Sequence, residues 1–176
     1  TKMTKPNLAS ISETKRVLDT FGLIAKKSLG QNFLVNQRVL DKIASLAELG
    51  ADDVVLEIGP GIGTLTQVLA DKAGFVYSVD LDKDMLEVLS ETCKSWNSKI
   101  KIFNKDALHL RKEDFCKKLP NTCVANLPFN IGATALLKVF EDFDFVKSAT
   151  VMLQKEVVER IMAAPGSKNY GAYSLK

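Results

Sequence analysis

The stretch Glu57-Ile-Gly-Pro-Gly-Ile-Gly-Thr64 decides the fold of this chain. It ends a short, apolar and β-branched run over 53–58, which is typical of a buried strand, and it leads into a helical pattern over 64–72. Three glycines leave space for a ligand to lie against the backbone, and the N-terminus of the next helix offers unpaired amides. The stretch therefore predicts a ligand-binding turn between a strand and a helix.

Outward from this turn, strand patterns and helix patterns alternate. Upstream, Ser10 with Glu13 predicts a capping box for a helix closed by Gly22, and Asn36 opens a second helix that Gly50 stops. Alternation of this kind predicts an α/β fold, a parallel sheet with helices on both faces. The further strands are expected at 75–79, 99–103, 122–125 and 149–153, and the further helices at 83–94, near 113–118, and at 133–140 and 155–162.

Polar or glycine residues follow the ends of successive predicted strands, at Gly59, Asp80, Asp106 and Asn126. In parallel sheets ligands collect at the carboxyl ends of the strands, near the point where the strand order reverses. A carboxylate at Asp80 can accept both hydrogens of a ribose diol, and one at Asp106 can accept a hydrogen bond from an adenine amino group. The glycine turn and the two carboxylates together predict a slot for adenosine.

The glycine spacing argues against a nicotinamide cofactor. A dinucleotide fingerprint needs G-x-G-x-x-G, whereas the glycines here stand at 59, 61 and 63, with Thr64 where the last one belongs. Pro60 also removes an amide that a pyrophosphate would use. A nucleoside ligand is favoured over a dehydrogenase cofactor, and a purely structural turn is the remaining alternative.

Asn126-Leu-Pro-Phe129 suggests chemistry on an aromatic amine. The adenine amino nitrogen is a poor nucleophile because its lone pair is delocalised into the ring. Hydrogen bonds to the Asn126 side-chain oxygen and the Leu127 carbonyl would favour a pyramidal nitrogen. Pro128 stiffens the turn, and Phe129 offers a face on which a target base can stack. The alternative is a plain strand-to-helix turn with Phe129 in the core.

Because these motifs occur in this order and at these spacings, the chain resembles the ribosomal RNA adenine dimethyltransferases. Leu29-Gly-Gln-Asn-Phe-Leu34 is similar to the N-terminal motif of that family, and 57–66 to its glycine loop. Val79-Asp-Leu-Asp-Lys-Asp84 is similar to its ribose motif, in which glutamate is commoner where Asp80 stands. Asn126-Leu-Pro-Phe-Asn130 is similar to its catalytic motif, with Phe129 in place of the commoner tyrosine.

The resemblance implies a Rossmann-like class I methyltransferase fold with S-adenosyl-L-methionine as the cofactor. It also implies dimethylation of N6 of two adjacent adenosines in small-subunit ribosomal RNA, as part of ribosome biogenesis. No metal is expected. The catalytic residues implied are Asn126, Leu127, Pro128 and Phe129, and the cofactor-binding residues are Gln31, Asn32, Phe33, Leu34, Glu57, Gly59, Gly61, Asp80, Leu81, Asp106, Ala107 and Asn126.

Two alternatives stay open on the resemblance. One is a large-subunit methylase of the erythromycin-resistance type, although Gln-Lys-Glu-Val-Val at 154–158 favours the small-subunit enzyme. The other is a ribosome-assembly or transcription factor that kept the fold without catalysis. The expected partner is the small ribosomal subunit, and the protein is expected to be a monomer. Its expected location is the cytoplasm, or an organellar stroma or matrix if a leader has been removed.

The domain interpretation follows from the same resemblance. Residues 1–28 are expected to form a basic extension with a short helix, and residues 29–176 the methyltransferase domain. Members of the family continue through two more strands and a small helical domain. The chain is therefore expected to be cut near the start of a sixth strand.

Charge is distributed in blocks, although the net charge is only +3. Residues 1–42 and 94–118 each carry eight basic and three acidic side chains, whereas 48–91 carries ten acidic and two basic ones. Two basic blocks suggest a surface that faces a polyanion, and the alternative is ordinary solvated lysines. The three cysteines form no metal or disulfide pattern, and no apolar run is long enough to cross a membrane.

Overall fold

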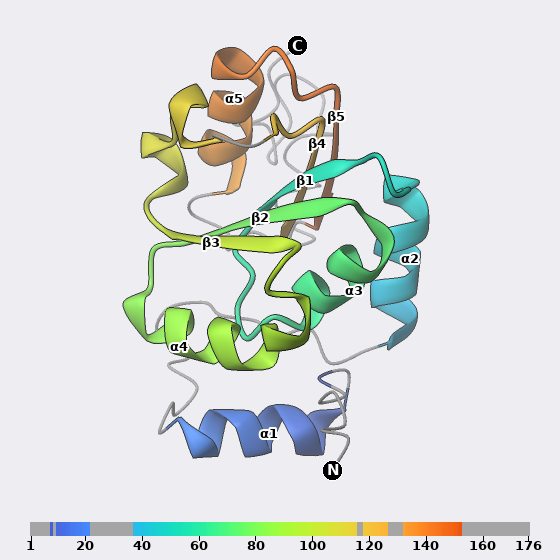
Figure 1. The fold of residues 1–176 in the computed structure, drawn as a ribbon, viewed down its shortest axis with the longest axis vertical. Helices are drawn as coiled ribbons and strands as arrows, with labels where there is room; N and C mark the ends of the chain where they lie inside the picture. The colour runs from blue at the N-terminus through green and yellow to red at the C-terminus, as the bar shows by residue number, and fades with distance from the viewer. Residues whose placement is uncertain (1–7, 9, 22–36, 116–117, 127–131, 153–176) are drawn as a thin grey trace, which may run out of the picture.

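A computed structural model describes residue 8 and residues 10–21, 37–115, 118–126 and 132–152 (Figure 1). The Gly22 and Asn36 helix boundaries and the helix expected at 155–162 lie outside these residues. Within them the helices are α1 (Ile11–Thr20), α2 (Gln37–Ala47), α3 (Thr64–Lys72), α4 (Lys83–Thr92) and α5 (Gly132–Asp142), with short 3-10 turns η2 (Lys94–Trp96), η3 (Ala107–His109) and η4 (Lys112–Asp114). The strands are β1 (Val54–Ile58), β2 (Phe75–Asp80), β3 (Ile100–Asn104), β4 (Thr122–Asn126) and β5 (Ser148–Met152).

The strands form a parallel sheet in the order β3-β2-β1-β4-β5. The chain builds outward from β1 to β3 and then returns to the other side of β1 with β4 and β5, so the strand order reverses between β1 and β4. The predicted parallel sheet is confirmed. The reversal fixes where a ligand is expected, beyond the carboxyl ends of β1 and β4.

Helices cover both faces of the sheet, as predicted (Figure 1). Val54, Leu56 and Ile58 of β1 pack in a cluster with α5, whereas Val55, between Val54 and Leu56, packs with α2 and α3 on the opposite face. Every residue of β1 is buried, because a central strand in a parallel sheet is covered from both sides.

The N-terminal helix packs on another helix. Leu8 and Val17 contact a buried cluster that includes Met85 and Leu89 of α4 (Figure 1). The Ser10 hydroxyl caps α1 by accepting a hydrogen bond from the Glu13 amide at 3.2 Å, as predicted. The Glu13 carboxylate, however, pairs with Arg16 one turn on. Of the two hydrogen bonds of the predicted capping box, the structure thus shows the one from the Glu13 amide to the Ser10 hydroxyl.

Some boundaries differ from the sequence prediction. The helix expected to reach Gly50 ends at Ala47, because Glu48 adopts a left-handed backbone conformation with φ 50°. The helix expected over 83–94 ends at Thr92 and gives way to η2. Of the range near 113–118 that was expected to be a helix, the described residues include the single turn η4, which ends at Asp114. None of the helices in the described ranges is both long and apolar enough to span a membrane.

Candidate active site

The glycine turn adopts a conformation that suits glycine at three positions. Gly59, Gly61 and Gly63 have φ of 76°, 56° and 95°, in the left-handed region that side chains disfavour. The Gly59 amide donates to the carbonyl of Val79 at 3.1 Å, which ties the turn to the end of β2. A Cβ at Gly63 would come within 2.7 Å of the Thr92 hydroxyl oxygen. The turn is therefore fixed by its backbone and by the packing of α4 against it.

Asp80 lies beside this turn at the end of β2. Its Oδ1 accepts a hydrogen bond from the Asp82 amide at 2.9 Å. Burial raises the pKa of Asp80 to about 6, against the opposing effect of hydrogen bonds from the backbone amides of Asp82, Gly61 and Leu81. The predicted meeting of Gly61 and Asp80 is thus present. The Leu81 side chain is largely exposed at 64%.

Glu57 is fully buried under the turn, on the side of the sheet that α3 covers. Its Oε2 accepts hydrogen bonds from the hydroxyls of Thr66 at 2.7 Å and Ser78 at 2.6 Å. Burial raises the pKa of Glu57 to about 7, and the negative charge of Asp80 adds to the rise. Glu57 Oε1 and Thr64 Oγ1 are buried without a hydrogen-bond partner among the described residues. Such atoms normally have a partner, so the turn suits a polar ligand or chain segment.

Asp106 follows β3, which neighbours β2. Its Oδ1 accepts from the Leu108 amide at 2.9 Å and caps η3, while Ala107 packs in the core. Asn104 was missed in the sequence analysis. Its side-chain amide donates to the carbonyls of Asp80 and Leu81, each at 3.1 Å, and so holds the ends of β2 and β3 together. The sequence signal that would have found it is its position directly after the strand predicted over 99–103, and in the structure it pairs in register with Asp80.

Asn126 is the last residue of β4 and pairs in register with Met152 of β5. The residue before it, Ala125, pairs with Ile58 of β1, directly before the glycine turn. The backbone of Asn126 is therefore at the same edge of the sheet as the turn. Its side chain and the other predicted residues of the two flanking motifs lie outside the described part of the chain: Gln31, Asn32, Phe33, Leu34, Leu127, Pro128 and Phe129.

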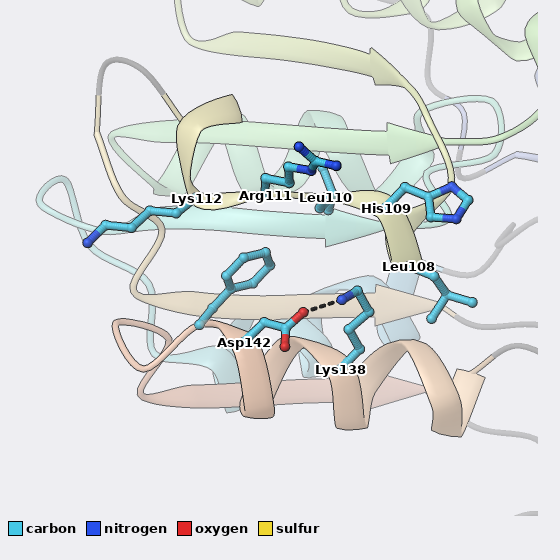
Figure 2. Close-up of a pocket in the computed structure, with 8 residues that line it drawn as sticks. Leu108, His109, Leu110, Arg111, Lys112, Lys138 and Asp142 are labelled. Carbon is cyan, nitrogen blue, oxygen red and sulfur yellow. Dashed lines mark hydrogen bonds and ion pairs between the residues drawn. The ribbon is translucent and has the colours of Figure 1, made fainter.

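A cavity of about 390 Å³ lies on the α5 side of the sheet, and none of its lining residues belongs to the glycine turn (Figure 2). His109, the only histidine, is exposed and lines it. Trp96 is buried, and its Nε1 donates to the Asp71 carboxylate at 2.8 Å.

Similar folds occur in solved methyltransferases. A dimethyladenosine transferase from Plasmodium falciparum has a TM-score of 0.66 and 31% identity, covering 79% of this chain and 49% of that one. The 23S rRNA methyltransferase ErmE has a TM-score of 0.64 and 31% identity, covering 73% and 50%. The fold and the position of the site define a Rossmann-like class I S-adenosylmethionine-dependent methyltransferase.

The chain belongs to the family described as "Ribosomal RNA adenine dimethylase", whose sequence model matches residues 22–176. It is 41% identical over 172 residues to ribosomal RNA small subunit methyltransferase A of Lachnoclostridium phytofermentans, and 39% identical over 174 residues to the protein of that name in Bacillus mycoides. Each match covers 96% of this chain and 59% of the relative. The chain thus spans less than two thirds of the length of these curated relatives.

Proposed function

We propose that the protein transfers methyl groups from S-adenosyl-L-methionine to N6 of two adjacent adenosines in small-subunit ribosomal RNA. The observation that carries the proposal is the contact between Asp80 and the glycine turn, which follows β1 beside the strand-order reversal, in a chain of the adenine dimethylase family. The relatives named above support the small subunit as the source of the substrate.

The described residues fit the cofactor. Asp80 offers acceptors for ribose hydroxyls beside a turn of three glycines in the left-handed conformation, and Asp106 follows the next strand, where it would accept a hydrogen bond from the adenine amino group. Glu57 Oε1 and Thr64 Oγ1 supply buried polar atoms under the turn. Gln31, Asn32, Phe33 and Leu34 are proposed to hold the methionine part. When bound, S-adenosyl-L-methionine supplies an electrophilic methyl group on its sulfonium.

The residues after β4 are proposed to handle the target base. The side-chain oxygen of Asn126 and the carbonyl of Leu127 accept the two hydrogens of the N6 amino group, which directs its lone pair outward. Phe129 stacks on the base, and Pro128 restrains the turn. The methylated nitrogen is acidic enough to lose its proton to water, so no strong general base is required of this chain.

The test uses the full-length protein, labelled S-adenosyl-L-methionine and small subunits that lack the modification. Mass spectrometry of the RNA should show two dimethylated adenosines next to each other. Asn126→Ala should abolish transfer while leaving cofactor affinity, measured by calorimetry, within a few-fold of the parent. Asp80→Asn should instead weaken cofactor binding.

Three outcomes would contradict parts of this proposal. If large subunits are supplied in a parallel reaction, label in large-subunit RNA alone would indicate the resistance-type activity, in line with the similarity to ErmE. Absence of both cofactor binding and transfer would indicate an assembly or transcription factor that kept only the fold. Loss of cofactor binding in Asn126→Ala would assign that residue to the cofactor.

We further propose that the protein acts as a monomer where small subunits are made, in the cytoplasm or an organellar matrix or stroma.

A further inference from the structure

The basic block at 94–118 divides into two groups in the structure. Several of its lysines are held by local partners: Lys94 pairs with Glu91 at 2.5 Å, Lys105 pairs with Asp114 at 2.9 Å, and the Lys99 ammonium donates to a carbonyl of α3. Arg111 and Lys112 differ, because both line the cavity on the α5 side of the sheet. Among the described residues of this block, Arg111 and Lys112 are therefore the candidates for a contact with a polyanion at this cavity.

The cavity has cationic side chains on two walls (Figure 2). Arg111 and Lys112, next to His109, come from the segment that joins β3 to β4, and Lys138 comes from α5. The one carboxylate among the lining residues, Asp142, pairs with Lys138 one turn earlier in the same helix. The other lining residues are apolar, and two of them are buried, Leu110 and Phe143. The Lys138–Asp142 pair is neutral. The Asp114 carboxylate, whose pKa is lowered by a hydrogen bond from the Arg111 amide, by Lys105 and by the Arg111 charge, also pairs with Lys105. The lining therefore keeps a net positive charge from Arg111 and Lys112 that attracts anions.

Both walls begin at the edge of the sheet that carries the proposed active site. Turn η3 follows Asp106 directly, and α5 begins at Gly132, shortly after Asn126. In Figure 2, Leu108 and His109 lie toward the arrowheads of the strands, and Lys112 lies near their starts. The cavity thus extends from the edge where a target adenine would enter, along the face opposite α3. A strand of nucleic acid with one base at that edge, and with its backbone running along this face toward the strand starts, would bring the phosphates that flank the base to these cations in turn.

We infer that this cavity binds the RNA backbone next to the target adenosine, through phosphate contacts from Arg111, Lys112 and Lys138. The inference rests on the proposed function and adds to it the surface that holds the substrate. The Lys112 ammonium lies 6.0 Å from the centroid of the Phe145 ring, so a cation–π contact restrains this side chain at the rim of the cavity that lies farthest from His109 (Figure 2). Because phosphates are common to every sequence, this surface contributes affinity and orientation, while the choice of adenosine lies elsewhere.

The test compares R111A/K112A with a control that loses the same charge elsewhere, K72A/K94A, at two exposed lysines near the ends of α3 and α4. Binding to a labelled small-subunit RNA hairpin is measured by fluorescence anisotropy over a range of salt concentrations. R111A/K112A should bind the hairpin about tenfold more weakly than the parent. The negative slope of the logarithm of the association constant against the logarithm of the salt concentration should become less steep by about one to two, whereas the control keeps the parent slope. K138A should show a smaller change in the same direction.

Further measurements separate this inference from the proposed function. A scrambled hairpin should show the same loss, and calorimetry should give the same S-adenosyl-L-methionine affinity for the parent and all three variants. If the parent binds cofactor and RNA and R111A/K112A has the parent's salt slope, the cavity inference is wrong and the proposed function stands. If R111A/K112A loses binding to whole subunits but not to naked RNA, the cavity contacts protein, and the inference is also wrong. A parent that binds neither ligand would overturn both.

Discussion

At the scale of single residues, the unusual group is Glu57. A carboxyl with no exposed surface is costly to ionise, and two hydroxyl donors only partly offset that cost. Its pKa of about 7 means that the folded protein binds a proton more tightly than the unfolded chain, whose group titrates near 4.5. The resulting contribution to stability is complete below about pH 4.5 and is lost as the pH rises through 7.

Glu57→Gln should remove most of this pH dependence. A rise in pKa from 4.5 to about 7 corresponds to on the order of 3 kcal/mol between the two ends of that pH range. Urea denaturation at pH 5 and pH 8 should show the parent losing stability with rising pH and the variant losing much less. A smaller loss of stability with rising pH should remain in the variant, because the pKa of Asp80 is also raised. Equal slopes in parent and variant would show that Glu57 is not the titrating group.

At the scale of elements, α3 and α4 are joined at the glycine turn by Thr92. This buried hydroxyl donates to the carbonyl of Ile62 at 2.8 Å, and the Gln67 side-chain amide donates to the Thr92 carbonyl at 2.7 Å. The last residue of α4 thus holds both the turn and the first part of α3. The position of the proposed cofactor-binding backbone therefore depends on a helix that follows β2.

Thr92→Val keeps the shape of the side chain and removes its donor. The buried Ile62 carbonyl would lose a partner, which should cost about 1–2 kcal/mol of unfolding free energy. Affinity for S-adenosyl-L-methionine, measured by calorimetry, should fall several-fold because the turn is released. Thr92→Ser, which keeps the hydroxyl, should retain most of that affinity. Parent-like cofactor binding in Thr92→Val would show that the turn holds its shape without this contact.

At the scale of the whole molecule, Asn121 joins the central strands at the opposite edge of the sheet. Its Oδ1 accepts from the Val54 amide at 2.7 Å, and its Nδ2 donates to the Asp53 carboxylate at 2.8 Å. Its backbone carbonyl accepts from the Lys147 amide, just before β5, at 2.8 Å. One side chain and its backbone thus connect β1, β4 and β5, the strands on either side of the order reversal.

Asn121→Ala should destabilise the entire domain by about 2–3 kcal/mol, because the Val54 amide would be left without its partner. The unfolding midpoint in urea should fall while the m value stays constant, since the surface exposed on unfolding is unchanged. Asn97→Ala, at an exposed asparagine after η2, serves as the matched control and should change stability by less than about 0.5 kcal/mol. Equal effects in the two variants would contradict the role given to Asn121.

The sequence by itself determined the order and type of the elements around the glycine turn. Apolar runs such as 54–58 and the glycines that follow act through local backbone and side-chain preferences, which are read directly along the chain. The carboxyl-edge positions of Gly59, Asp80 and Asp106 followed as well, because parallel strands bring their ends to one edge. Helix ends were placed less well, since Glu48 stops α2 through a backbone conformation that its side chain does not signal.

Only the tertiary structure decided which of these residues touch. The burial of Glu57 depends on hydroxyls that lie 9 and 21 residues away in the chain, and the link from Thr92 to Ile62 spans 30 residues. The cavity joins a connecting segment to α5, so its cations are separated in the sequence by the whole of β4. Contacts of this kind arise from how the sheet and its helices pack, and periodicity along a single chain carries no information about them.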